Sequence, residues 1–235
     1  LYEKDPQKLI DYASKLEEGI KGMDLISFNT KDVDFSDYPV QSLVEIMSNN
    51  FDPNYGGTNK APKFMMPNNL EYLMRYAYEN DDVTILNHVS LSLDKIAYGG
   101  VYDHIGGGFS RYSVDNKWHI PHFEKMLYDN AQLVSLYSNA FLLTKNPLYE
   151  EVVNESLGFI TREMTNIEGA FYSSLDADSK SESGELEEGA YYIYTKNELE
   201  SLLEADFKLF EAYYNINSFG KWEGEKYVLI RDKSD

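Results

Sequence analysis

The sequence contains no cysteine, and this absence excludes several kinds of chemistry from the chain. Disulfide bonds, thiol nucleophiles and thiolate metal sites all need a cysteine sulfur, so none of them can form within these residues. No apolar run approaches the roughly 18 residues that a membrane-spanning helix needs. The chain also begins without the pattern of a secretory signal peptide. We therefore expect a cytoplasmic protein with no membrane partner.

Basic residues are scarce relative to acidic ones. The chain has 21 Lys and Arg against 40 Asp and Glu, which gives a formal charge of −19. Such a surface repels nucleic acid, so no nucleic-acid partner is expected. It favours neutral or cationic ligands, although acidity also simply keeps proteins soluble. The 20 Tyr and 12 Phe are numerous for a helical protein. Aromatic side chains line sugar-binding pockets as well as ordinary cores.

Apolar residues recur every three or four positions in much of the chain, which predicts amphipathic helices. One segment, from 123 to 143, is apolar nearly all round, so we expect it to be a helix buried by other helices. The long predicted helices span residues 6–21, 67–79, 82–97, 123–143 and 147–165, and shorter ones span 39–50, 195–204 and 206–214.

Glycines mark the ends of three predicted helices. Gly57, Gly99 and Gly169 each follow a helix and precede a loop that leads to the next one. Glycine is the usual residue at a left-handed helix stop, and the recurrence indicates a repeat of helical hairpins. Two aromatic runs, at 170–173 and 190–194, predict strands that pair as a small hairpin at the rim of the domain.

Polar residues concentrate between Gly99 and Asp129, where three of the four histidines lie. The triplet Gly106–Gly108 allows the backbone to approach a ligand or another segment closely. Titratable side chains at the inner end of a cavity are candidates for acid–base chemistry. The candidate catalytic residues are His104, His122, Asp103, Glu124 and Asp129. The candidate substrate-binding residues are Tyr102, Arg111, Tyr112, Trp118, His119, Asp176 and Asp178.

Each candidate also has a purely structural interpretation. Glu124 lies in the first turn of the predicted helix 123–143, where a carboxylate favours the helix dipole. Asp129 could accept hydrogen bonds from a loop backbone, and Arg111 could pair with a carboxylate of the fold. The histidines could be satisfied core residues.

Neither a metal nor a cofactor is expected from the motifs. His119 and His122 are spaced as a metal pair, but the HExxH pattern is absent. The glycine triplet lacks the GxxxxGK[ST] pattern of a phosphate loop. The acidic stretch after Asp176 fails the EF-hand pattern, because Ser181 occupies its sixth position.

Three runs resemble the YyaL-like, or spermatogenesis-associated protein 20-like, family: YGGTNKAPKFMMP, GGVYDHIGGGFSRYSVDNKWHIPHFEKMLYDNAQL and GAFYSSLDADS…EEGAYYIYT. The resemblance covers roughly Asn50 to Tyr194. It implies an N-terminal thioredoxin-like domain followed by an (α/α)6 toroid similar to N-acylglucosamine 2-epimerase and six-hairpin glycosidases. This chain shows no thioredoxin-like part and no CxxC, so we expect a middle portion of a longer protein. The thioredoxin-like domain is then an expected partner within the same parent chain.

The expected fold is accordingly all-α, an incomplete (α/α)6 toroid with a small β-hairpin at the rim. Residues 1–235 are expected to form a single toroid-domain fragment. Within it, residues 1–38 are an N-terminal helix and linker, and residues 39–235 form the helical hairpins.

Three functions fit these residues. A carbohydrate-acting enzyme would use either two carboxyl groups for hydrolysis or two bases for epimerisation. In a hydrolase, a carboxyl group of the Gly99–Asp129 segment would pair with Asp176 or Asp178, and in an epimerase His104 would work with His122. The alternative is a non-catalytic module that binds a sugar, a peptide or a protein partner. In the third, purely structural, interpretation the glycine triplet and the histidines only lock the loop to the inner helices.

Overall fold

The computed structural model describes residues 5–23, 40–181 and 183–232, and the chain divides into two compact units, Leu1–Leu43 and Val44–Asp235. The first unit contains α1 (Pro6–Met23), which confirms the helix predicted at 6–21. The rest of the predicted linker, from residue 24 to 38, lies outside the described residues. Among the described residues, no helix is long and apolar enough to span a membrane.

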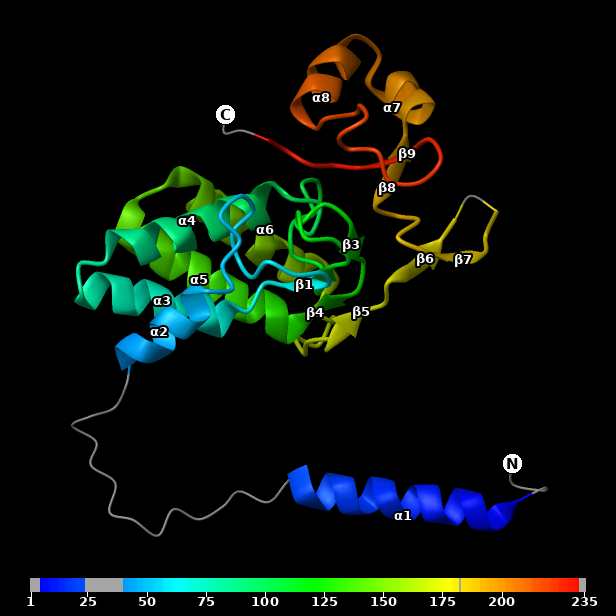
Figure 1. Cartoon of the computed structure of the whole chain (residues 1–235). Helices are drawn as coiled ribbons and strands as arrows, with labels where there is room; N and C mark the ends of the chain where they lie inside the picture. The colour runs from blue at the N-terminus through cyan, green and yellow to red at the C-terminus, as the bar shows by residue number, and fades with distance from the viewer. Residues whose placement is uncertain (1–4, 24–39, 182, 233–235) are drawn as a thin grey trace. The chain divides into compact units, whose positions relative to one another are not determined.

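Two helical hairpins form the larger part of the second unit. After α2 (Val40–Ser48), short turns join α3 (Pro67–Glu79) to α4 (Val83–Tyr98) and α5 (Leu127–Thr144) to α6 (Pro147–Glu163). Helix α3 packs on both α4 and α5, and α5 packs on α6, so the two hairpins lie side by side (Figure 1). This arrangement confirms the helical-hairpin repeat predicted from the glycines, and it is the repeating unit of the α/α toroid that the family resemblance implied.

The sequence determines where these helices begin. Asp82 precedes α4 and accepts hydrogen bonds from the backbone N–H groups of Thr84 and Ile85. Asn146 caps α6 in the same way, and Pro147 follows it at the first helical position. An N-cap satisfies backbone donors that the helix itself leaves unpaired, and proline fits the first turn because it has no N–H to lose.

The core lies between the hairpins. Leu93 and Ile96 of α4 and Leu133 and Tyr137 of α5 are at most 1% exposed. Burial of each such side chain stabilises the fold by roughly 1.5–3 kcal/mol. The hydroxyl of Tyr137 donates to the carbonyl of Leu93 at 2.8 Å, so this buried polar group is satisfied.

Helix α5 begins four residues later than predicted. The preceding residues are extended, and β4 (Lys125–Met126) pairs with β5 (Ser174–Leu175). The interpretation of Glu124 as a first-turn helix residue is therefore wrong, and Asp129 occupies that turn instead. The reason is non-local, because the extended conformation is stabilised by a strand almost fifty residues further along the chain.

The predicted pairing of the runs 170–173 and 190–194 is also wrong, although small antiparallel pairs are present. The polar insert turns back on itself and forms its own hairpin, which leaves the second run to pair near the end of the chain. The pairs are β6 (Asp178–Lys180) with β7 (Leu186–Glu188), and β8 (Ile193–Thr195) with β9 (Lys226–Val228). A three-stranded sheet joins β1 (Lys63–Phe64), β2 (Tyr112–Ser113) and β3 (Pro121–His122).

Two short helices complete the unit. Thr195 and Glu198 form a capping box at the start of α7 (Lys196–Leu203), and α8 (Phe207–Tyr213) follows a single 3₁₀ turn. Their apolar side chains build a separate small core with β9. The N–H of Arg231 donates to the carbonyl of Tyr98 at 2.8 Å, which ties this C-terminal segment to the end of α4.

Candidate functional site

The glycine-rich loop is shaped by close backbone approach. A Cβ atom at Gly108 would lie 2.3 Å from the Phe159 ring, and one at Gly107 would lie 2.5 Å from the carbonyl oxygen of Glu155. Both glycines also have positive φ angles, which other residues rarely adopt. Gly99 has φ −73°, so it is not the left-handed stop that its position predicted. It is required because a Cβ there would meet the Trp118 carbonyl oxygen at 2.5 Å.

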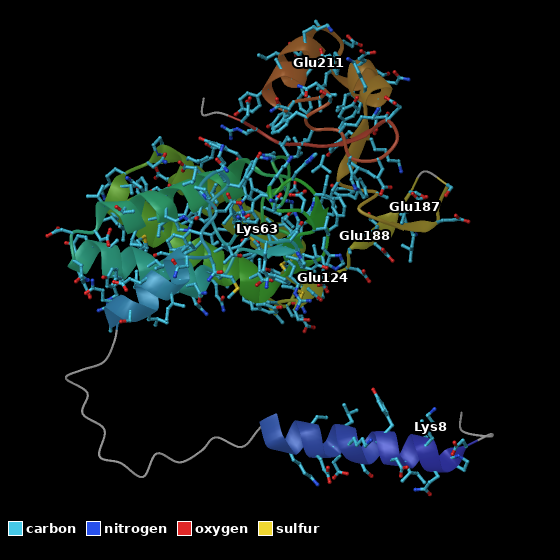
Figure 2. The ribbon with its side chains drawn as sticks, in the orientation of Figure 1. Lys8, Lys63, Glu124, Glu187, Glu188 and Glu211 are labelled. Carbon is cyan, nitrogen blue, oxygen red and sulfur yellow. The ribbon has the colours of Figure 1, made fainter. Side chains whose placement is uncertain are left out.

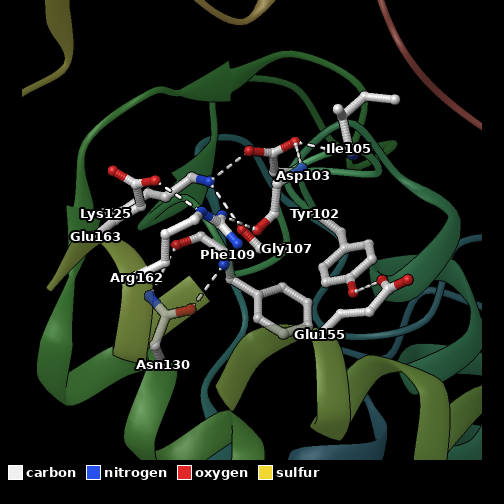
Figure 3. Close-up of polar contacts among 11 residues, drawn as sticks. Tyr102, Asp103, Ile105, Gly107, Phe109, Lys125, Asn130, Glu155, Arg162 and Glu163 are labelled. Atoms are coloured by element: carbon white, nitrogen blue, oxygen red, sulfur yellow. Dashed lines mark hydrogen bonds and ion pairs between the residues drawn. The ribbon is translucent and has the colours of Figure 1, made fainter. Parts of the chain in front are cut away.

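Asp103 holds this loop from within. One carboxylate oxygen accepts hydrogen bonds from the N–H groups of Ile105 and Gly106, and the other accepts from the Lys125 ammonium at 2.8 Å (Figure 3). Burial alone would raise the pKa of Asp103, but the charge of Lys125 and the two N–H donors outweigh it and lower the pKa. The carboxylate is therefore ionised and fully engaged, which is the arrangement expected of a structural residue.

Lys125 is the counter-ion, and its side chain is only 1% exposed. It also donates to the Gly107 carbonyl at 3.0 Å. Its ammonium lies 4.4 Å from the centre of the Phe159 ring and 4.8 Å from that of Tyr192. Burial lowers the pKa of Lys125, and the Asp103 carboxylate opposes that shift.

Asn130 joins the loop to α5. Its amide oxygen accepts from the N–H of Phe109 at 2.7 Å, and its amide nitrogen donates to the carbonyls of Phe109 and Met126. Figure 3 shows the hydrogen bond between Asn130 and Phe109, and beside it the contact of the Tyr102 hydroxyl with the Glu155 carboxylate. Tyr102 and Asn130 are both buried, so each holds the loop against the interior of the protein.

Two of the three histidines in the segment are enclosed. His104 contacts the carbonyl oxygen of Gly99 at 3.1 Å, and burial together with the charge of Arg231 lowers its pKa to about 4. His119 stacks on Phe219, and burial lowers its pKa as well. A neutral histidine that bonds a backbone carbonyl, as His104 does, is the pattern of a satisfied core residue, whereas Nε2 of His119 is buried without a hydrogen-bond partner.

The third histidine belongs to a more exposed polar array. His122 bonds Glu188 at 2.9 Å and lies 4.0 Å from Glu124, which in turn pairs with Arg111 at 3.2 Å. Figure 2 shows Glu124 and Glu188 on the same side of the unit. The His122 ring stacks on Tyr112 at 5.0 Å, so the array has an aromatic floor.

Asp129 lies beside this array at the edge of a cleft of about 220 Å³. Its Oδ2 atom is buried and has no hydrogen-bond partner. Burial raises the pKa of Asp129 to about 6, which Arg111 opposes and Glu124 reinforces. Buried polar atoms without a protein partner are uncommon in folded proteins, and the Oδ2 of Asp129 shares this property with Nε2 of His119 and Oγ of Ser156. The cleft is lined by Phe64, Met65, Met66, Pro67, Asn68, Asn69, Arg111, Asp129, Gln132 and Leu133.

The remaining candidates lie apart from this cleft. Trp118 is completely buried, and its indole N–H donates to the carbonyl of Tyr55 at 2.7 Å. Asp176 and Asp178 are exposed, and Asp178 is in register with Glu188 on the β6–β7 hairpin. Within the described part of the chain, no group of three or more histidine or acidic side chains could hold a metal ion.

Several residues that build these features are not among the candidates predicted from the sequence. Lys125 and Asn130 stood within the recognised segment, but nothing local showed that they are buried. The cleft wall at Asn68 and Asn69 comes from the start of α3, where the apolar periodicity predicts an amphipathic helix and no site. Its one sequence signal is a pair of asparagines directly after two methionines and a proline.

Comparisons with known proteins agree with the fold. No family model matches the chain. It is 44% identical to spermatogenesis-associated protein 20 of Homo sapiens over 158 residues, which are 65% of this chain and 20% of that protein. The chain is a relative of spermatogenesis-associated protein 20. An uncharacterized protein of Caenorhabditis elegans is 37% identical over 180 residues, which are 73% of this chain and 25% of that protein.

The chain therefore spans only a fifth to a quarter of the length of these relatives. Among solved structures, a sugar epimerase from a ruminal bacterium matches 72% of this chain and 47% of its own chain. The TM-score is 0.52 at 15% identity, which shows a shared fold and no more. The predicted resemblance to the spermatogenesis-associated protein 20-like family and the predicted α/α-toroid architecture are both confirmed.

Proposed function

We propose that the cleft beside Asp129 binds a neutral carbohydrate and that Asp129 donates a proton to it. The observation that carries this proposal is the buried, unpartnered Oδ2 of a carboxyl group whose pKa is raised to about 6. Such a group keeps a large protonated fraction up to about pH 6, well above the range of an ordinary aspartate, and a raised pKa is the property that a general acid needs. The cleft also offers the amide groups of Asn68, Asn69 and Gln132, which are suited to sugar hydroxyls.

The geometry favours some versions of the carbohydrate hypothesis over others. Asp103 is engaged by Lys125 and two backbone donors, and His104 contacts a backbone carbonyl, so neither has a free group for acid–base work. A mechanism based on a His104–His122 pair is therefore disfavoured. Arg111 and Glu124 are the charged groups of the exposed array that act on the pKa of Asp129.

The sugar epimerase match supports the proposal only through the fold. The net charge of −19 supports a neutral ligand, because a polyanion would be repelled.

The first experiment is a calorimetric and thermal-shift screen of the protein against monosaccharides, disaccharides and amino sugars. A sugar that binds should lose affinity in Asp129→Asn. The matched control is Asp206→Asn, which removes the same charge from an exposed position outside the cleft. No binding by any sugar, or equal affinity in both variants, would contradict the proposal.

Turnover is tested separately with any sugar that binds. If Asp129 acts as an acid, the rate should fall as the pH rises through about 6 and should be lost in Asp129→Asn. Binding without turnover at every pH would leave the non-catalytic binding module as the function of the cleft.

A further inference from the structure

A second cavity adjoins the Asp129 cleft, and its chemistry is different. It has a volume of about 160 Å³ and opens between the end of α2 and the start of α3. None of its lining residues is Asp, Glu, Lys or Arg. They are Met47, Asn50, Phe51, Gly57, Thr58, Phe64, Met65, Met66, Asn69, Leu70, Leu73 and His88.

The one titratable residue in this cavity is uncharged at neutral pH. His88 stacks flat on Phe51, with ring centres 3.5 Å apart. Burial, together with the charge of Lys63, lowers the pKa of His88 to about 4. The cavity is thus a place where an apolar group gains by leaving water and a charged group would lose its hydration.

The two cavities share one wall. Phe64, Met65, Met66 and Asn69 line both of them. Phe64 is 40% exposed and Met66 is 47% exposed, so apolar surface faces solvent at this junction. Methionine side chains are flexible and adapt to ligands of different shape. A ligand lying in both cavities would cover this exposed apolar surface.

We propose that the ligand is a neutral glycoside with an apolar aglycone. The sugar occupies the Asp129 cleft, and the alkyl or aryl group passes over Phe64 and Met66 into the apolar cavity. This inference rests on the proposed function, because it assigns the sugar to the Asp129 cleft. It adds that affinity depends on the apolar part and that the cavity lined by Leu70 and Leu73 recognises that part.

The test compares the methyl, hexyl and phenyl glycosides of the sugar that binds best, each below its aggregation concentration. Burial of even two methylene groups corresponds to about a tenfold gain in affinity, so the hexyl glycoside should bind at least about tenfold more tightly than the methyl glycoside. Two variants fill the cavity from different elements, Thr58→Phe and Met47→Trp. Each should remove the hexyl gain and leave methyl glycoside binding intact, which also shows that the variant is folded.

The matched control is Ile46→Trp, which adds the same bulk next to Met47 at a position that is 62% exposed. It should keep the hexyl gain. Equal affinity for methyl and hexyl glycosides would overturn this inference and leave the sugar proposal in place. A hexyl gain that persists in both filled variants would also overturn it, because the alkyl chain would then bind elsewhere. Failure of every glycoside, methyl included, would instead remove the proposed function itself.

Discussion

The ion pair between Lys125 and Asp103 gives the sharpest test of how the loop is held. Replacement of Lys125 by methionine keeps most of the side-chain volume and removes the charge. Asp103 would then be a carboxylate whose counter-ion is gone, with a side chain only 15% exposed. Breaking a buried ion pair by removing one partner costs about 3–5 kcal/mol.

The lower end of that range applies here. Asp103 would still accept hydrogen bonds from Ile105 and Gly106, which compensate part of its charge. We therefore expect Lys125→Met to lower the free energy of unfolding by about 3 kcal/mol. For a chain of this size, about 3 kcal/mol corresponds to a fall of roughly 6–12 °C in the melting temperature.

The assay is urea and thermal denaturation of the protein at neutral pH. The double variant Lys125→Met/Asp103→Asn should be more stable than Lys125→Met alone, because asparagine accepts the same N–H bonds without a charge. Lys221→Met removes an ammonium from the exposed pair with Glu225 and should leave the transition within replicate scatter. A loss below about 1 kcal/mol in Lys125→Met, or a double variant as unstable as the single one, would refute the reasoning.

Three further predictions concern the same region. Gly108→Ala should destabilise the protein by more than Gly169→Ala in denaturation, because the φ angles are +80° and +84° but only a Cβ at Gly108 meets a neighbouring ring, and equal losses would contradict the packing argument. Asn130→Ala leaves the buried N–H of Phe109 unpaired and should cost about 1–3 kcal/mol in unfolding free energy, and a neutral result would contradict the role of that bond. Because the pKa of Asp129 is raised, its contribution to stability is present below its unfolded pKa near 3.8 and is lost as the pH rises through about 6. Unfolding measured from pH 4 to 7 should therefore show a smaller loss of stability with rising pH in Asp129→Asn, and an unchanged slope would count against the shifted pKa.

The helices could be predicted because their signals are local. Apolar periodicity gave the bounds of α3 correctly, and it located α4 and α6 to within two residues. The start of α5 was missed because Lys125 and Met126 pair with Ser174 and Leu175, a partner that no local pattern reveals. The pairing predicted for the runs 170–173 and 190–194 was wrong for the same reason, because the true partner of the second run is distant in the sequence.

The site was predicted as a region but not as a geometry. The sequence placed Asp103 and Asp129 in one polar segment, and their roles separate only in three dimensions. Asp103 is buried against a lysine that lies 22 residues away, whereas Asp129 faces a wall made by Asn68 and Asn69 from an earlier helix. Which carboxyl group is engaged depends on those long-range neighbours.

The brevity of the strands has a consequence for how copies of this protein meet one another. No strand among the described residues is longer than three residues. A strand edge recruits another chain by offering a row of unpaired N–H and C=O groups, and short strands offer very few. The protein can therefore display Phe171 and Tyr191, which are 60% and 72% exposed, without presenting a ladder on which a second copy could add a strand. Exposed aromatic side chains and resistance to edge-to-edge aggregation are thus compatible in one molecule.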